Sequence, residues 1–241
     1  MTAKNRSTLR HFENDEIVGA LLNLPRRIWA RYDGKIPLKP SQLIELQVAT
    51  AIELLLAAPI RRKNLTSIRP DRNLIPRGDG RKRRLHLYFS PREVKNEFEV
   101  EFELPESTVQ MFDRYMAEIR PHLPTSQSMY VFPGATGVSN KCPNLLSTQI
   151  AALTASEIGV RITAHQFRHI AGFLYLKSNP GGHEIVRRLL GHRSIETTLK
   201  FYAGMETSAA LRHYDRLILS ERERLRGPLQ KRDRKASGRP Q

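Results

Sequence analysis

The sequence predicts a mainly α protein of the α+β class: a multi-helical domain with one small antiparallel β-sheet of two to three strands. Apolar residues recur at helical spacing up to about residue 58 and again after Pro105. Between these regions, residues 85–89 and 98–104 alternate apolar and polar side chains, as half-buried strands do. Proline and glycine punctuate the boundaries, which favours separate short elements.

The N-terminal part is expected to hold two helices behind a polar lead-in at residues 1–12. Pro25 lies inside the first helical pattern and is expected to break or bend it. A second helix opens at Pro40 and ends before Pro59. The apolar period of the first helix is carried by Ile17, Leu21, Leu22, Ile28 and Trp29.

The remaining elements are predicted by their caps and turns. The Gly-Asp-Gly sequence at 78–80 indicates a turn between strands. Gly159 is expected to cap a helix over 145–158, and Gly191 is expected to end a helix that begins near His183. Residues 163–166, Thr-Ala-His-Gln, fit the capping box of a helix start.

Two further helices are expected at the C-terminal end of the chain. Ser194 is predicted to cap the first, and an amphipathic segment over 205–226 forms the last. The basic tail at 227–241 is poor in apolar residues and is expected to be disordered. The expected organisation is therefore one domain over 13–226 between a short lead-in and this tail.

The charge of the chain points to a polyanionic partner. Among 241 residues, 40 Lys and Arg face 24 Asp and Glu, a formal net charge of +16. Residues 61–84 hold ten basic and two acidic side chains, and residues 221–241 hold eight and three. Because the charge is concentrated in segments, nucleic acid is the favoured partner.

Cysteine content and hydropathy suggest where the protein works. Cys142 is the only cysteine, which excludes an internal disulfide and a thiolate zinc cluster. No apolar run approaches the roughly eighteen residues that span a bilayer, and no apolar signal core follows the N-terminus. We expect a prokaryotic cytoplasmic protein associated with the nucleoid, without a membrane partner.

Two groups suited to bind one phosphate are expected in the first and second turns of the helix that this capping box starts. His165 and Arg168 are spaced i and i+3, so on a helix their Cβ atoms lie about 5–6 Å apart on one face. The planar guanidinium of Arg168 can hold two non-bridging phosphate oxygens and keeps its charge. This pair alone is common on basic helices, and it gains weight from the residues that follow.

The segment Leu190-Gly-His-Arg-Ser-Ile-Glu-Thr-Thr198, with Tyr202 beyond it, is the most specific pattern in the chain. Together with His165-Gln-Phe-Arg168 and the basic cluster at 61–63, it resembles the catalytic domain of the tyrosine recombinase (phage-type integrase) family. The resemblance covers about residues 13–226. It implies the recombinase catalytic-domain fold and the roles given below.

The family's first arginine stands where a core helix ends, and Arg61 in Pro59-Ile-Arg-Arg-Lys-Asn-Leu65 matches it best. Arg62 is the competing candidate. Asn64 occupies the place of the family's usual Glu, and Pro59 the place of its usual Gly, so this local geometry departs from the pattern.

The family's lysine lies in the turn of the small sheet, where this sequence has Lys95, with Lys82 as a second candidate. A lysine there can protonate the leaving 5′-oxygen of DNA. The resemblance makes His192 a ligand of the scissile phosphate and gives His165 a similar or proton-shuttling part. His169 and His183 have no place in the pattern.

Tyr202 is the expected nucleophile, forming a covalent phosphotyrosine. The family commonly has this tyrosine nine positions after the box histidine, where Phe201 stands here. Tyr202 is therefore turned about 100° further if the segment is regular helix. Tyr214 lies too far along, and the competing interpretation makes Tyr202 a packed core aromatic in an inactive protein.

The resemblance implies a DNA strand-exchange enzyme that uses a 3′-phosphotyrosyl link and needs no metal or nucleotide cofactor. The catalytic set is Arg61, Lys95, His165, Arg168, His192 and Tyr202. Further DNA contacts are expected from Arg62, Lys63, Arg81, Lys82, Arg83, Arg84 and Arg193. The partner is double-stranded DNA, bound as a homotetramer in which residues 205–226 dock onto a neighbour.

Family members usually carry an N-terminal helical domain that closes around DNA, and fewer than twenty residues precede the first helix here. We therefore expect weak, strongly salt-dependent DNA binding by this chain alone. The alternatives are a catalytically silent DNA-binding regulator and a type IB topoisomerase or telomere resolvase. A helix-turn-helix repressor would explain the charge but not the order of Arg61, Lys95 and Tyr202.

Overall fold

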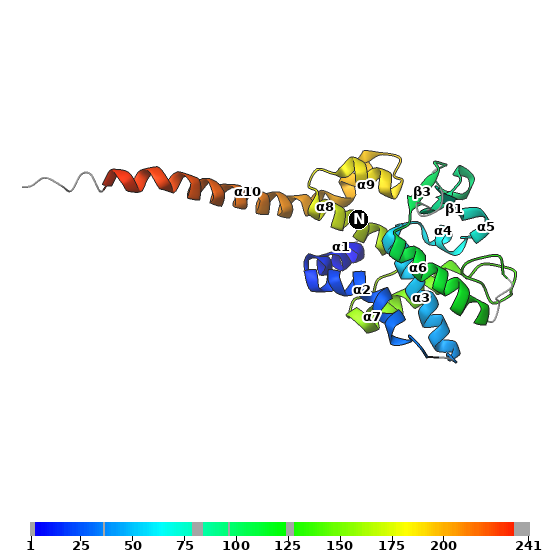
Figure 1. Cartoon of the computed structure of the whole chain (residues 1–241). Helices are drawn as coiled ribbons and strands as arrows, with labels where there is room; N and C mark the ends of the chain where they lie inside the picture. Colours follow the sequence, from blue (N-terminus) through cyan, green and yellow to red (C-terminus); the bar gives the residue numbers. More distant parts are fainter. Residues whose placement is uncertain (1–2, 36, 79–83, 96, 124–127, 234–241) are drawn as a thin grey trace, which may run out of the picture.

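The computed structural model describes residues 3–35, 37–78, 84–95, 97–123 and 128–233. Within these ranges, only the backbone is described for residues 3–4, 201, 203–210, 212–213 and 226–233. The fold is mostly helical with one small sheet, as the sequence predicts (Figure 1).

The first half begins with a short helix and a 3-10 turn, followed by two long helices. Two short helices and the strands of the sheet, with a second 3-10 turn between strands, complete it. In order, these elements are α1 (Ala3–Arg10), η1 (His11–Glu13), α2 (Asp15–Arg31), α3 (Pro40–Ala57), α4 (Arg62–Thr66), α5 (Pro70–Asn73), β1 (Leu74–Arg77), β2 (Arg84–Phe89), η3 (Pro91–Glu93) and β3 (Val100–Glu103).

The second half is helical. It consists of α6 (Glu106–Arg114), the π-helical turn η4 (Tyr115–Ile119), η5 (Arg120–His122), α7 (Pro143–Ile158), α8 (Gln166–Ser178), α9 (His183–Leu190) and α10 (Ile195–Asp233).

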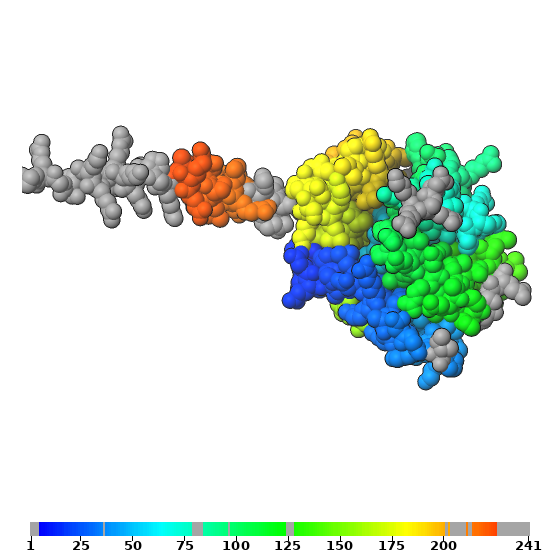
Figure 2. Space-filling model, in the orientation of Figure 1, coloured from blue at the N-terminus to red at the C-terminus, as the bar shows by residue number. Residues whose placement is uncertain are grey.

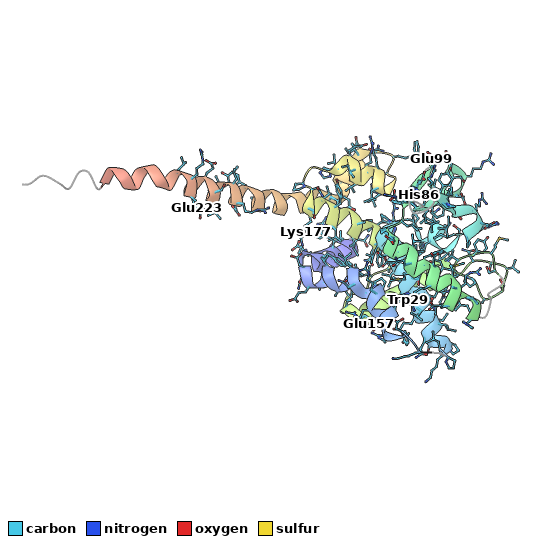
Figure 3. The ribbon with its side chains drawn as sticks, viewed as in Figure 1. Trp29, His86, Glu99, Glu157, Lys177 and Glu223 are labelled. Carbon is cyan, nitrogen blue, oxygen red and sulfur yellow. The ribbon has the colours of Figure 1, made fainter. Side chains whose placement is uncertain are left out.

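The N-terminal residues fold onto the body, where the sequence predicts a polar lead-in over 1–12. Leu9 and Phe12 are buried in the core. The amide of Gln166 on α8 donates to the hydroxyl of Thr8, at 2.8 Å. Lys177 of α8 also forms an ion pair with Asp15 at 2.6 Å (Figure 3). Leu9 and Phe12 anchor this mainly polar stretch to the body, while most of its polar side chains stay exposed.

Helix α2 runs unbroken through Pro25, where the sequence predicts a break or a bend. Asn14 caps its start by accepting a hydrogen bond from Glu16 N at 2.8 Å. Leu21, Leu24 and Ile28 are completely buried around the proline. Packing of this face holds the helix together despite the hydrogen bond that proline cannot donate.

The sheet has three antiparallel strands in the order β1-β2-β3. Leu87 on the central strand lies opposite Leu74 on β1 and Phe102 on β3. Leu87 and Phe89 are fully buried, so one face of β2 packs into the body. The sheet lies on the side of the molecule away from α1 and α2 (Figure 1).

Three predicted helix ends coincide with the caps that predicted them. Gly159 and Gly191 adopt left-handed φ values of 71° and 56° after α7 and α9, which glycine tolerates without strain. The hydroxyl of Ser194 accepts from Glu196 N at 3.1 Å at the start of α10. The tight connection between α9 and α10 therefore follows from local sequence.

Helix α8 begins at Gln166, so His165 is its N-cap residue and lies just outside the first turn in which the sequence places it. The Gln166 side chain reaches back to accept from Thr163 N at 2.8 Å, which is one half of the predicted capping box. Arg168 falls in the first turn of the helix.

Helix α10 is continuous from Ile195 to Asp233, where the sequence predicts separate segments and a disordered tail from residue 227. Its first turns pack beside α9 and α8, and the rest leaves the body (Figures 1 and 2). Residues 234–241 of the predicted tail lie outside the described residues. Tyr202 thus lies on a regular helix. No helix in the described part of the chain is both long and apolar enough to cross a membrane.

Candidate active site

Arg168 is buried at the start of α8 and joins three segments. One terminal nitrogen donates to the carbonyl of Pro59 at 2.6 Å, and the other donates to the carbonyl of Leu190. These bonds fix the guanidinium between the end of α3 and the end of α9. Burial and the nearby charge of Arg61 lower the pKa of Arg168 to about 10, so it remains a cation at neutral pH.

Arg61 stands at the N-cap of α4 and faces the same hollow as Arg168. Gly191 also lines this hollow, and the sheet closes its other side with Val100 and Phe102. Arg61 is partly buried, and this burial lowers its pKa. Two guanidinium groups therefore face the same partly apolar hollow. Their mutual repulsion costs free energy, and a bound anion would offset it.

His192 lies at the edge of this cationic group. Its Nδ1 is 2.9 Å from the hydroxyl of Thr198, and Arg187 donates to its backbone carbonyl at 3.0 Å. Burial, Arg168 and Arg61 lower the pKa of His192 to about 4, so the ring is neutral at pH 7. If Thr198 donates to Nδ1, the ring proton lies on Nε2, which can then donate to a phosphate.

His165 is exposed at the start of α8. Its ring meets His169 edge to face, with centroids 4.8 Å apart. Loss of water contact and the charges of Arg168 and Arg62 lower the pKa of His165. We call Arg61, His165, Arg168 and His192 the cationic cluster, since Arg61 and Arg168 act electrostatically on both imidazoles.

Lys95 lies in the turn after η3 and is exposed. In the described part of the chain, no hydrogen bond or ion pair joins it to the cationic cluster. The base of its turn is fixed by Asn64, which is buried and donates to the carbonyl of Glu93 at 2.9 Å. Asn64 belongs to α4, the short helix that Arg61 precedes. Its bond to Glu93 therefore links the helix that follows Arg61 to the turn that carries Lys95. A glutamate at position 64 could accept but not donate while ionised.

Tyr202 is completely buried on the inner face of α10. Its hydroxyl donates to the carbonyl of His169 at 3.4 Å. The ring lies so close to Gly172 that any Cβ at that position would overlap the hydroxyl. Burial raises the pKa of Tyr202, and the charge of Arg168 partly opposes this effect. The phenol therefore lies against α8 and faces away from solvent.

The predicted DNA contacts fall into three groups. Arg62 and Lys63 are exposed on α4. Arg84 forms an ion pair with Glu103, and Arg193 lies 4.0 Å from Glu97, both at exposed positions. The remaining three, Arg81, Lys82 and Arg83, lie outside the described residues. Lys82 is also the second candidate for the family's lysine.

Several residues that sequence reasoning left out contact the predicted site. His169 was expected to be ordinary, yet it touches His165 and Tyr202. Gly172 makes room for the phenol, and Arg187 holds the backbone of His192. These roles depend on contacts between different helices, which the sequence does not show. Only for His169 and Gly172 was there a signal, because their spacing puts them on one face of a helix. In the described residues, no group of three or more His, Cys, Asp or Glu lies together as metal ligands would.

Arg61 and Arg168 face one hollow, two imidazoles lie within their electrostatic influence, and a tyrosine-bearing helix packs beside them. Groups of this kind have the chemistry to bind a phosphodiester. The profile described as "Phage integrase family" matches residues 37–208, more than two thirds of the chain. The chain belongs to the phage integrase family. A search of curated protein sequences found no significant match.

Solved structures support the fold. The XerH site-specific recombinase bound to palindromic difH substrate, in a post-cleavage complex, superposes with a TM-score of 0.59 at 16% identity. The match covers 88% of this chain and 52% of that one. The pre-cleavage XerH complex gives 0.58 and 16%, covering 78% and 48%. This chain thus spans about half the length of the XerH chain.

Proposed function

We propose that this protein is a tyrosine-type site-specific DNA recombinase that cuts and rejoins DNA through a 3′-phosphotyrosyl intermediate. The observation that carries the proposal is the convergence of Arg61, Arg168, His165 and His192 on one place. All four are suited to bind a phosphate, and they come from three separate segments of the chain. The family membership gives this arrangement a matching chemistry.

In the proposed reaction, the hydroxyl oxygen of Tyr202 attacks the phosphorus, and its proton passes to the neutral imidazole of His165. Arg61 and Arg168 hold the non-bridging oxygens while negative charge builds up on them. The bond to the 5′-oxygen breaks, and Lys95 gives that oxygen a proton, leaving a 5′-hydroxyl. Attack by a 5′-hydroxyl of the partner duplex reverses the step and releases Tyr202. Because the arginines supply the positive charge, the step needs neither metal nor nucleotide.

The buried position of Tyr202 adds a step to this proposal. The phenol is packed against Gly172 and hydrogen-bonded to the carbonyl of His169, and it does not line the hollow that Arg61 and Arg168 face. The first turns of α10 must shift or unwind before attack, and Ser194 and Gly191 just upstream are the short connection about which they can move. The proposed enzyme is therefore at rest until DNA or a neighbouring subunit displaces this segment.

Assembly on DNA as a homotetramer is part of the same proposal. Beyond its first turns, α10 carries exposed apolar side chains that a neighbouring subunit could cover: Leu211, Tyr214, Leu217, Leu219 and Leu225. Light scattering with and without DNA tests this: the chain alone should be monomeric, and tetramers should appear only on DNA. Tetramers without DNA would contradict DNA-dependent assembly.

A second candidate function is a catalytically silent DNA-binding regulator. It is favoured by Tyr202, which packs like an ordinary core aromatic. The two functions differ in whether the phenol ever leaves its buried place.

Trapping on nicked suicide duplexes taken from the sequence that flanks the gene separates them. The wild-type protein should form an adduct resistant to sodium dodecyl sulfate, also in the presence of EDTA. Tyr202→Phe should form none, whereas Phe201→Leu should retain it. DNA binding without any adduct would support the silent regulator. Binding itself should weaken steeply with salt, as phosphate contacts do.

A further inference from the structure

The turn between η3 and β3 presents a large apolar side chain that the proposed reaction does not use. Phe98 is 66% exposed. Single exposed apolar residues are common on protein surfaces. This one is three positions after Lys95, and its neighbour Glu97 lies 4.0 Å from Arg193, the residue that follows His192. Its place near the cationic cluster makes it informative.

The base of the turn is firmly held, while its tip projects. Val94 is buried, and Asn64 bonds the carbonyl of Glu93. Ser90 and Glu93 form a capping box in which the Glu93 carboxylate accepts from Ser90 N at 2.9 Å and from its hydroxyl at 2.7 Å. A side chain presented on such a fixed base loses little conformational freedom when it binds.

Phe98 lies two residues before β3, whose apolar side chains reach the hollow. Along β3 the half-buried Val100 and Phe102 alternate with the exposed Glu101 and Glu103. Val100 and Phe102 line the hollow with Arg61 and Arg168. Glu99 is at the outer edge of the sheet (Figure 3). The turn that carries Phe98 is thus continuous with the strand that lines the hollow.

The surroundings of the ring fit DNA. Lys95, Arg92 and Arg193 are exposed around the turn, and Glu97 next to Phe98 lies 4.0 Å from Arg193, which partly neutralises it. Arg193 directly follows His192. An apolar group in a basic setting, beside a phosphate site, suits a ligand with a charged backbone and stacked apolar bases. A protein partner would instead require a wider apolar patch.

We propose that Phe98 is a wedge that enters a groove of the bound duplex and partly unstacks the base step beside the phosphate held by the cationic cluster. Apolar side chains of this kind kink DNA by inserting between base steps. The inference rests on the proposed function and adds a structural requirement to it: cleavage takes place on locally deformed DNA. Phe98 then contributes to the choice of site through the ease with which a step unstacks.

The test uses the full chain and the flanking-sequence duplex, with 2-aminopurine placed in turn at each base around the mapped cleavage position. The variants are Phe98→Ala and Phe98→Leu, with Leu22→Ala as control because Leu22 is an exposed apolar residue on α2, away from the sheet. Thermal melting verifies that each variant is folded. Wild type and Leu22→Ala should raise the fluorescence at one step on binding.

Phe98→Ala should abolish this fluorescence rise and slow adduct formation about tenfold or more, as loss of a base–aromatic contact does. Phe98→Leu should retain part of both, and the salt dependence of binding should not change. Equal fluorescence and adduct rates for Phe98→Ala and wild type would overturn the wedge while leaving the proposed function intact. A wild-type protein that neither binds the duplex nor forms an adduct would overturn both.

Discussion

The cationic cluster and Tyr202, the two parts of the proposed catalytic site, differ in how the fold positions them for reaction. The cationic cluster is preformed, because Arg168 is fixed by the carbonyls of Pro59 and Leu190 before any substrate arrives. Tyr202 is equally buried, yet its hydroxyl is bonded to the backbone of α8 and not directed into the hollow. The phosphate-binding half of the site is therefore ready, and the nucleophilic half is withheld. In the proposed mechanism, DNA therefore binds first and Tyr202 becomes reactive only afterwards.

The strongest test of this contrast is Tyr202→Phe. It removes the nucleophilic hydroxyl, which also donates to the His169 carbonyl at 3.4 Å, so we expect adduct formation to fall at least about a thousandfold. The free energy of unfolding should change by less than about 1 kcal/mol. Suicide-substrate trapping and urea denaturation measure the two effects. Tyr175→Phe, at a half-buried position on α8 outside the site, is the matched control and should leave both unchanged. An adduct surviving in Tyr202→Phe would mean that another residue attacks.

Asn64 tests whether the preformed half includes the lysine turn. Asn64→Asp removes the donor to the Glu93 carbonyl, so Lys95 should lose its position and cleavage should slow about 10- to 100-fold. A duplex with a 5′-bridging sulfur needs no proton on its leaving group and should restore the rate. The same duplex should not rescue Arg61→Ala, which lacks a phosphate contact. A defect in Asn64→Asp that the sulfur duplex fails to correct would show that Asn64 does not act through Lys95.

Gly172→Ala tests whether Tyr202 is withheld by its packing. The added methyl group overlaps the Tyr202 hydroxyl and should drive the phenol outward, at a cost of about 1–3 kcal/mol in stability. We expect adduct formation to rise severalfold despite this loss. Gly182→Ala is the control, since its Cβ would lie 2.6 Å from the ring of Tyr175, outside the site. It should destabilise the protein without raising the rate. A slower Gly172→Ala would indicate that the buried position is the reactive one.

The smallest expected effect concerns pH and two imidazoles, that of His192 in the cluster and that of the buried His169 beside it. Burial and the neighbouring cations hold the pKa of His169 at about 3 and that of His192 at about 4, below the value of about 6.5 in the unfolded chain. Between pH 6.5 and 4 the unfolded chain therefore binds more protons, and stability falls as the pH is lowered through this window.

Urea denaturation at pH 7 and pH 5 should show a loss on the order of 2 kcal/mol for wild type. His169→Phe should reduce this difference, whereas His122→Gln, at an exposed position, should not. A free energy of unfolding that is higher at pH 5 than at pH 7 would show that burial and the neighbouring cations do not disfavour protonation of these imidazoles.

Local signals in the sequence determined much of this protein. Gly159, Gly191 and Ser194 set helix boundaries that the structure reproduces, because a cap needs only its neighbours along the chain. The alternation of residues 85–89 and 98–104 predicted strands in the right place for the same reason. The order of motifs predicted the family, which the profile match over residues 37–208 confirms.

Tertiary structure decided what these residues touch. The carbonyl partners of Arg168, the bond from Asn64 to Glu93 and the docking of α1 on α8 all join segments that are far apart in the sequence. The position of Tyr202 was open as well, since an exposed and a buried phenol fit the same helical sequence. It was settled by Gly172, whose missing side chain leaves room for the ring on the neighbouring helix. A residue type predicts its chemistry, whereas only packing determines which way the side chain faces.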